Sequence, residues 1–369
     1  DDDSTHARSA AETALRLRPD LPEAHVAMGY YQSQCRKAYD EALRELATAD
    51  QLQPNSGEVA EALGLVLRRR GRLAEALEEL QRAARLNPRS AELASDIGLT
   101  AWFLRRYAVS EGSFDRALGL APDWVVPWAQ KVWLRVSWRG DLDSARALFA
   151  TAASKVGLGN LVGYMNPDAV FLVPEDAASR RAFEQLAVRD FEDDTALYAV
   201  TKAEWYRLHG AADKVRIYSD SARRGLEMEL REAQVLPWRR GFLGYAYAGL
   251  GRRDDAVREG VAGERMAADP VSRAFTALAL ARIYAMVDDR PAAIAKLDTL
   301  LAMPSPVSAQ LLRADPTWAR LRGEPGFREL LDRYGSAASA MAGIPALTWT
   351  RAPSRRSSWR TRGAPRSPA

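Results

Sequence analysis

Cysteine and histidine are scarce in this sequence, with one cysteine and three histidines among 369 residues. Cys35 has no partner for an internal disulfide, and a Cys/His metal cluster needs more ligands than are present. No apolar run approaches the roughly 20 residues that a membrane-spanning helix needs, and the first three residues are aspartates rather than the basic start of a signal peptide. We expect no metal, no cofactor and no membrane span. The expected location is cytoplasmic as written, or periplasmic if an upstream segment carries a span.

Lysine is also scarce, since only 6 of the 52 basic residues are lysine and the rest are arginine. The formal net charge is +4, but residues 335–369 hold six arginines and no acidic residue. Without them 46 basic residues face 48 acidic ones, a balance of −2. We therefore expect no nucleic-acid binding by the body of the protein. The basic segment, which also contains Trp349 and Trp359, leaves binding to nucleic acid or acidic lipid open, beside the alternative of an unselected terminus.

What the sequence does have is a repeat of about 34 residues. Prolines end successive apolar-periodic stretches at Pro19, Pro54, Pro88 and Pro122. Within each unit the apolar residues recur three and four positions apart, which predicts two amphipathic helices per unit. A small residue recurs in the first helix and a bulky one in the second, where close helix packing needs them. The small residues are Gly29, Gly64 and Gly98, and the bulky ones are Leu46, Leu80, Phe114 and Phe149.

This pattern resembles the tetratricopeptide repeat (TPR), whose signature is W-x2-L-G-x2-Y, A-x3-F, P. The resemblance implies an all-α solenoid, in which antiparallel helix pairs form a right-handed superhelix. A helical cap and a disordered tail complete the predicted fold. The predicted segments are a partial repeat at 1–21, four repeats at 22–153, an irregular connector with a helix at 154–192, three TPR-like repeats at 193–302, a helical cap at 303–334 and a disordered basic tail at 335–369.

The end of the array carries a further set of motifs. They are Leu311-Leu312-Arg313, Asp315-Pro316, Trp318, Leu321-Arg322, Pro325, Phe327, Leu330-Leu331 and Tyr334. This arrangement resembles the C-terminal TPR region of bacterial multidomain regulators, in which a serine/threonine kinase or a cyclase precedes the repeats. The chain itself has no kinase nucleotide loop or catalytic loop, so we expect no enzymatic activity from it. A regulatory or oligomerising segment of a truncated kinase or cyclase is the alternative function.

Other motifs that could form a catalytic or binding site are better explained by structural roles. Gly157-Leu158-Gly159 superficially resembles a phosphate loop, but no Lys-Ser/Thr follows it, and a connector is the better interpretation. Acidic pairs such as Asp254-Asp255 are typical of solvated helix starts. His25 occupies a position where the repeat favours a packing residue.

The strongest candidate site is the inner surface of the array. Positions 2, 5, 9 and 12 of each first helix form a stripe that stacking aligns into a concave groove. We predict that a peptide or protein partner binds Tyr30, Glu61, Leu65, Arg68, Glu92, Leu99, Trp102 and Trp133. Aromatic residues supply large contact area at such surfaces; the alternative is that Trp102 and Trp133 pack against neighbouring helices or the connector. The acidic residues of the stripe argue against a clamp for a C-terminal carboxylate.

Overall fold

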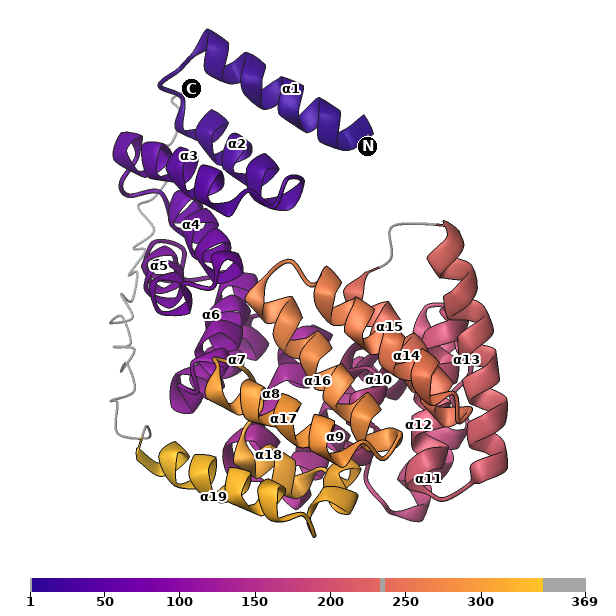
Figure 1. Ribbon diagram of the computed structural model, residues 1–369. Coiled ribbons are helices and arrows are strands. Elements are labelled where there is room, and N and C mark those ends of the chain that lie inside the picture. Colours follow the sequence, from indigo (N-terminus) through magenta and orange to yellow (C-terminus); the bar gives the residue numbers. More distant parts are fainter. Residues whose placement is uncertain (1, 233–235, 341–369) are drawn as a thin grey trace, which may run out of the picture.

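The computed structural model describes residues 2–232 and 236–340, and within those ranges every regular element is a helix (Figure 1). This confirms the predicted all-α solenoid. The first half contains α1 (Asp2–Leu17), α2 (Pro22–Gln34), α3 (Tyr39–Leu52), α4 (Gly57–Arg70), α5 (Leu73–Leu86), α6 (Ala91–Phe103), α7 (Tyr107–Leu120), α8 (Val125–Arg139) and α9 (Leu142–Val156). The second half contains α12 (Thr195–Leu208), α13 (Ala212–Glu232), α14 (Pro237–Gly249), α15 (Arg253–Met266), α16 (Pro270–Met286), α17 (Arg290–Ala302), α18 (Ala309–Ala314), η3 (Pro316–Leu321) and α19 (Pro325–Ala340).

Glycines set the distance between paired helices. A Cβ at Gly98 would lie 2.4 Å from a ring carbon of Phe114, and one at Gly64 would lie 2.7 Å from Leu80 Cγ. No larger residue fits there without displacing its neighbour. The turn at the end of α4 uses Gly71 with φ of 90°, a backbone conformation that favours glycine. The predicted helix pairing and the predicted role of the small residues are confirmed.

The joint between the two sets of pairs is more helical than predicted. It contains α10 (Leu158–Met165), η1 (Pro167–Leu172), α11 (Ala177–Glu184) and η2 (Val188–Phe191). The prediction of one helix within residues 154–192 is wrong, because α10 and α11 both form there, and the chain breaks between α11 and η2, where the Ala187 amide donates to the Asp190 carboxylate at 2.7 Å. Phe171, Phe183 and Phe191 are buried here. The joint is therefore part of the core rather than a loose connector.

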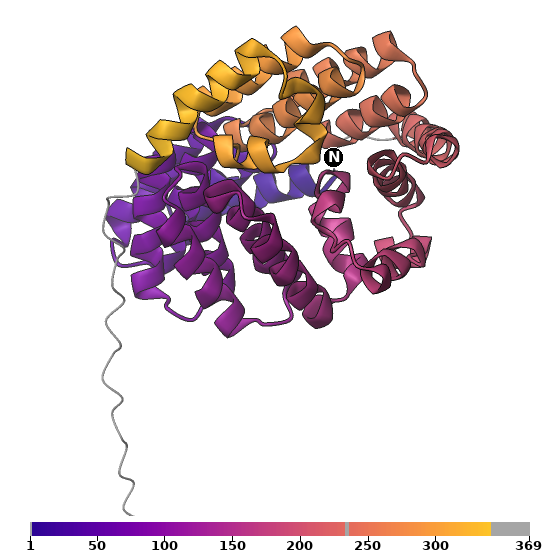
Figure 2. The same cartoon turned by 90° about the horizontal axis from the view of Figure 1, so that it is seen from below.

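The chain curves until its C-terminal half packs against its N-terminal half, as Figure 2 shows. Helix α16 contacts α4, and α18 contacts α8. The rings of Phe103 and Phe275 meet edge to face with centroids 5.8 Å apart. The Ser308 hydroxyl donates to the Ser137 carbonyl at 2.5 Å.

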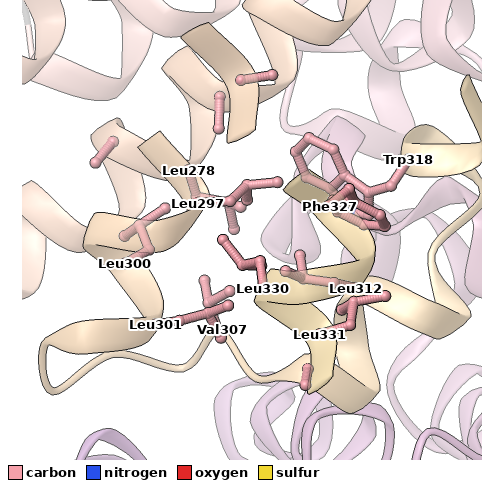
Figure 3. Packing of buried hydrophobic residues seen from close by; sticks show 14 of the residues in the cluster. Leu278, Leu297, Leu300, Leu301, Val307, Leu312, Trp318, Phe327, Leu330 and Leu331 are labelled. Carbon is pink, nitrogen blue, oxygen red and sulfur yellow. The ribbon is translucent and has the colours of Figure 1, made fainter. Parts of the chain in front are cut away.

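The C-terminal helices cover the apolar face of α16 and α17. Leu330, Phe327 and Trp318 pack on Leu297 and Leu300 in this cluster (Figure 3). Helix α19 continues to Ala340, so the tail predicted from Gly335 begins too early. Its remainder, 341–369, lies outside the described residues. Within the described ranges no helix is long and apolar enough to cross a membrane.

Candidate binding surface on helices α2, α4 and α6

The first helices of successive pairs lie side by side along the inside of the curve. Helix α2 contacts α4, and α6 contacts α8, in addition to the contacts that each helix makes with its own partner. This places Tyr30, Glu61 and Glu92 of the predicted stripe on one continuous surface. The second helices of these pairs, α3, α5 and α7, lie on the outer side of the curve, as expected for stacked helix pairs.

Part of this surface is acidic. We define the acidic face as Tyr30 on α2, Glu58 and Glu61 on α4, and Glu92 and Asp96 on α6. Burial raises the pKa of Glu61, and the carboxylates of Asp96, Glu92 and Glu58 raise it further. Burial and the carboxylates of Glu61 and Glu58 also raise the pKa of the Tyr30 phenol, against a smaller opposite effect of Arg69. The five groups therefore share one electrostatic environment.

Few positive charges lie near the acidic face, and one of them is already paired with a carboxylate. Arg68 donates to the Asp96 carboxylate at 2.7 Å, and its side chain is only 15% exposed. This pair joins α4 to α6. In contrast, Glu61 makes no hydrogen bond or ion pair within residues 2–232 and 236–340, although it is half-buried. With Arg69 counted, four carboxylates face two guanidinium groups, a balance of −2.

Two predicted contact residues belong to the interior instead. Trp102 is 3% exposed and packs with Phe114 and Leu134. The prediction that Trp102 is an exposed anchor is therefore wrong, because α7 and α8 close over it. Trp133 is half-buried, and its ring meets Phe171 of the joint edge to face at 5.9 Å. The alternative that both tryptophans pack internally describes the structure better.

The remaining predicted residues are accessible to different extents. Leu65 and Leu99 are half-buried at the edges of core clusters. Glu92 is exposed, and the Ser90 hydroxyl donates to it at 3.1 Å. The structure thus brings Tyr30, Glu61 and Glu92 together and leaves the two leucines beside core clusters. Whether any of them binds a partner stays a prediction.

Sequence reasoning missed two members of the surface. Glu58 lies 34 positions before Glu92, so the repeat register marks it as equivalent. Tyr164 comes from α10; it is 42% exposed. Burial and the Asp96 carboxylate raise the pKa of its phenol. No repeat signal indicates Tyr164, because α10 lies outside the periodic units.

The described residues offer little for catalysis at this surface. Within residues 2–232 and 236–340, no group of three or more His, Cys, Asp or Glu side chains has the geometry of a metal site. The acidic face can attract cations, accept hydrogen bonds and contact apolar groups through Tyr30.

Comparisons with known proteins agree with the repeat. The tetratricopeptide repeat family model matches residues 57–90, which hold α4 and α5. A search of curated protein sequences found no match.

A search of solved structures found chains of low similarity. A tetratricopeptide repeat protein from Parabacteroides merdae has 17% sequence identity and a TM-score of 0.45, with 75% of this chain and 91% of that chain covered. PilF from Pseudomonas aeruginosa has 15% identity and a TM-score of 0.39, with 66% and 91% covered. Yeast Tom70 has 14% identity and a TM-score of 0.41, with 89% and 62% covered. The family match and the helix pair together identify residues 57–90 as a tetratricopeptide repeat.

Proposed function

We propose that this protein is a protein-interaction scaffold that binds a peptide or protein segment along α2, α4 and α6. The observation that carries the proposal is Glu61, a half-buried carboxylate without a partner in the described residues, beside the Tyr30 phenol and three further carboxylates. Burying an unpaired carboxylate costs free energy, and a bound partner that supplies donors would remove that cost.

The repeat architecture supports this proposal. Stacked helix pairs present an extended inner surface on a rigid frame, and such surfaces suit the recognition of chain segments. The Arg68–Asp96 ion pair fixes α4 against α6 and so holds Glu61 and Glu92 in place. We further propose a bacterial regulatory setting, which rests on the resemblance of the closing motifs around Trp318. Reading the coding sequence on both sides of this segment tests that setting.

Selection of a peptide from a random displayed library tests the binding function. The affinity of the selected peptide is then measured by calorimetry for the wild type, Tyr30→Phe and Glu61→Gln. Tyr30→Phe removes the hydroxyl and Glu61→Gln removes the negative charge, each with little change of volume, so we expect weaker binding in a folded protein. Trp102→Ala is unsuitable because Trp102 is buried in the core.

Glu78→Gln is the matched control, because Glu78 is exposed on the outer helix α5. We expect it to bind the selected peptide like the wild type. Equal affinity for all four proteins would show that the peptide binds elsewhere and would contradict the proposed surface.

A further inference from the structure

The same chain contains a segment whose charge is opposite to that of the acidic face. Residues 341–369 contain six arginines and no acidic residue, and Trp349 and Trp359 lie among them. The acidic face carries four carboxylates against two guanidinium groups. Opposite charge on the face and on this segment is the first reason to connect them.

The second reason is position. The segment follows α19, whose Phe327 and Leu330 share a core cluster with Leu73 of α5 and Phe103 of α6. Helix α19 contacts α17 and α18, and through this cluster it belongs to the same hydrophobic core as α5 and α6. At about 3.3 Å per extended residue, Arg351 reaches about 35 Å from Ala340 and Arg366 about 85 Å.

The third reason is the unsatisfied chemistry of the face. Glu61 has no partner in the described residues, and the Tyr30 hydroxyl likewise makes no hydrogen bond there. An arginine supplies five N–H donors in a planar group that matches a carboxylate and also stacks on an aromatic ring. If the segment binds there, the tryptophans among its arginines would add apolar contact.

We propose that the arginine-rich segment 349–366 docks in cis on the acidic face, through Glu58, Glu61, Glu92 and Tyr30. Tethering raises the local concentration of the segment to the millimolar range, so even a weak contact is occupied. Docked in this way, the segment competes with any external partner. That regulatory consequence rests on the proposed function, whereas the docking itself does not.

The exposed Cys35 permits a direct test in the full chain. It is the only cysteine, and it follows α2, five residues or about 7.5 Å along the helix axis from Tyr30. A bimane fluorophore on Cys35 is quenched by nearby tryptophan. We expect brighter emission when Trp349→Phe and Trp359→Phe are combined, because the docked tryptophans no longer quench.

Charge variants show whether the acidic face is responsible. We expect Glu58→Gln, Glu61→Gln and Glu92→Gln together to relieve quenching, as should about 0.5 M salt, which screens the charges. The control combines Glu78→Gln, Glu192→Gln and Glu329→Gln at exposed positions elsewhere, and it should leave quenching intact. Unchanged emission in the tryptophan variant, or equal quenching in both glutamine triples, overturns the proposal.

A competition experiment separates docking in cis from binding of an external segment. A synthetic peptide of residues 349–366 is titrated into the full chain and into a full chain carrying R351S, R355S, R356S, R360S, R362S and R366S. We expect the peptide to bind the second protein about tenfold more tightly or better, because its face is no longer occupied. Equal affinity would show that only external basic segments bind and would overturn docking in cis. Failure of either experiment leaves the selected-peptide test of the proposed function unaffected.

Discussion

At the residue scale, a missing side chain decides how closely α6 and α7 pack. Alanine at Gly98 gains about 1 kcal/mol of helix propensity. However, its Cβ would lie 2.4 Å from the ring of Phe114, which is fully buried. Overpacking of this kind costs about 1–3 kcal/mol. We expect Gly98→Ala to lower the free energy of unfolding, measured by urea denaturation.

Gly112 provides the matched control one helix further on. It lies in α7, and a Cβ there would meet nothing within 4 Å. Gly112→Ala should therefore stabilise the protein by up to about 1 kcal/mol. Stabilisation by both substitutions would show that Gly98 does not set the helix spacing.

Lys202 makes stability depend on pH. Its ammonium group is buried and donates to the carbonyls of Phe183 and Glu184 at 2.8 and 2.9 Å. Burial lowers the pKa of Lys202 to about 8, whereas an unfolded lysine has a pKa of about 10.4. Between these values the unfolded state binds more protons, so stability rises with pH. We expect this rise between pH 7 and 9.5 in the wild type, and its loss in Lys202→Met.

The pH range chosen for the Lys202 measurement ends below pH 10, because above that pH two tyrosines change the stability in the opposite direction. Burial raises the pKa of Tyr198 and Tyr247 to about 12 each. Their unfolded forms ionise first, which lowers stability as the pH rises further. A parallel pH dependence in the wild type and Lys202→Met would contradict the assignment to Lys202.

Residue-level prediction from the sequence succeeded where the cause is local. Gly64 and Leu80 belong to one repeat unit, so the 34-residue register reveals that they meet. The prediction for Trp102 was wrong because its burial depends on α7 and α8 together. The pattern of one helix contains no information about which other helices cover that helix.

At the scale of elements, Arg282 of α16 connects the joint to the C-terminal cap. It donates to the Asp315 carboxylate at 2.7 Å and to the Thr317 hydroxyl at 3.0 Å, and it lies 3.4 Å from Asp168 of η1. Arg282 and Asp315 are buried. Arg282→Met would leave buried carboxylates without a cation, which costs about 3–5 kcal/mol. We expect a loss of that size in chemical denaturation.

Two further variants distinguish a buried pair from charge alone. Adding Asp315→Asn to Arg282→Met removes one of the unpaired charges and should restore part of the stability. Arg253→Met breaks a more exposed pair with Asp289 and should cost less than about 1 kcal/mol. Equal losses in Arg282→Met and Arg253→Met would contradict the linking role.

The paired helices could be predicted from the sequence, whereas the short helices of the joint could not. Paired helices were predictable because each pair satisfies its own apolar face within about 34 residues. The short helices of the joint were not, because Phe171 and Phe183 are buried by α8, α9 and α12, which no periodic pattern connects to them. Arg282 and Asp168 likewise resemble ordinary surface charges until the fold brings them together.

At the scale of the whole molecule, closure of the curve depends on contacts between residues about 200 positions apart. The Arg105 guanidinium donates to the carbonyl of Leu301 at 2.8 Å, with longer contacts to those of Met303 and Val307. The repeat pattern predicts a curved array but does not predict that its two halves contact each other. Of the candidate site, the sequence indicated Tyr30, Glu61 and Glu92, while Tyr164 came from an element without a repeat register.

Arg105→Ala should loosen this closure while the helix pairs remain folded. The substitution leaves the three carbonyls without the Arg105 donor, and an unmade hydrogen bond to a charged donor costs about 1.5–3 kcal/mol. Because α18 packs on α8 next to this contact, we expect faster amide exchange in α18 and in the segment before it. Helices α12 and α13 should keep their protection, since they lie away from Arg105.

Arg106→Ala is the matched control for Arg105→Ala, because Arg106 is exposed beside the same turn. Faster exchange along the entire chain in Arg105→Ala would mean that closure and the helix pairs unfold as one unit, which contradicts a separable closing contact.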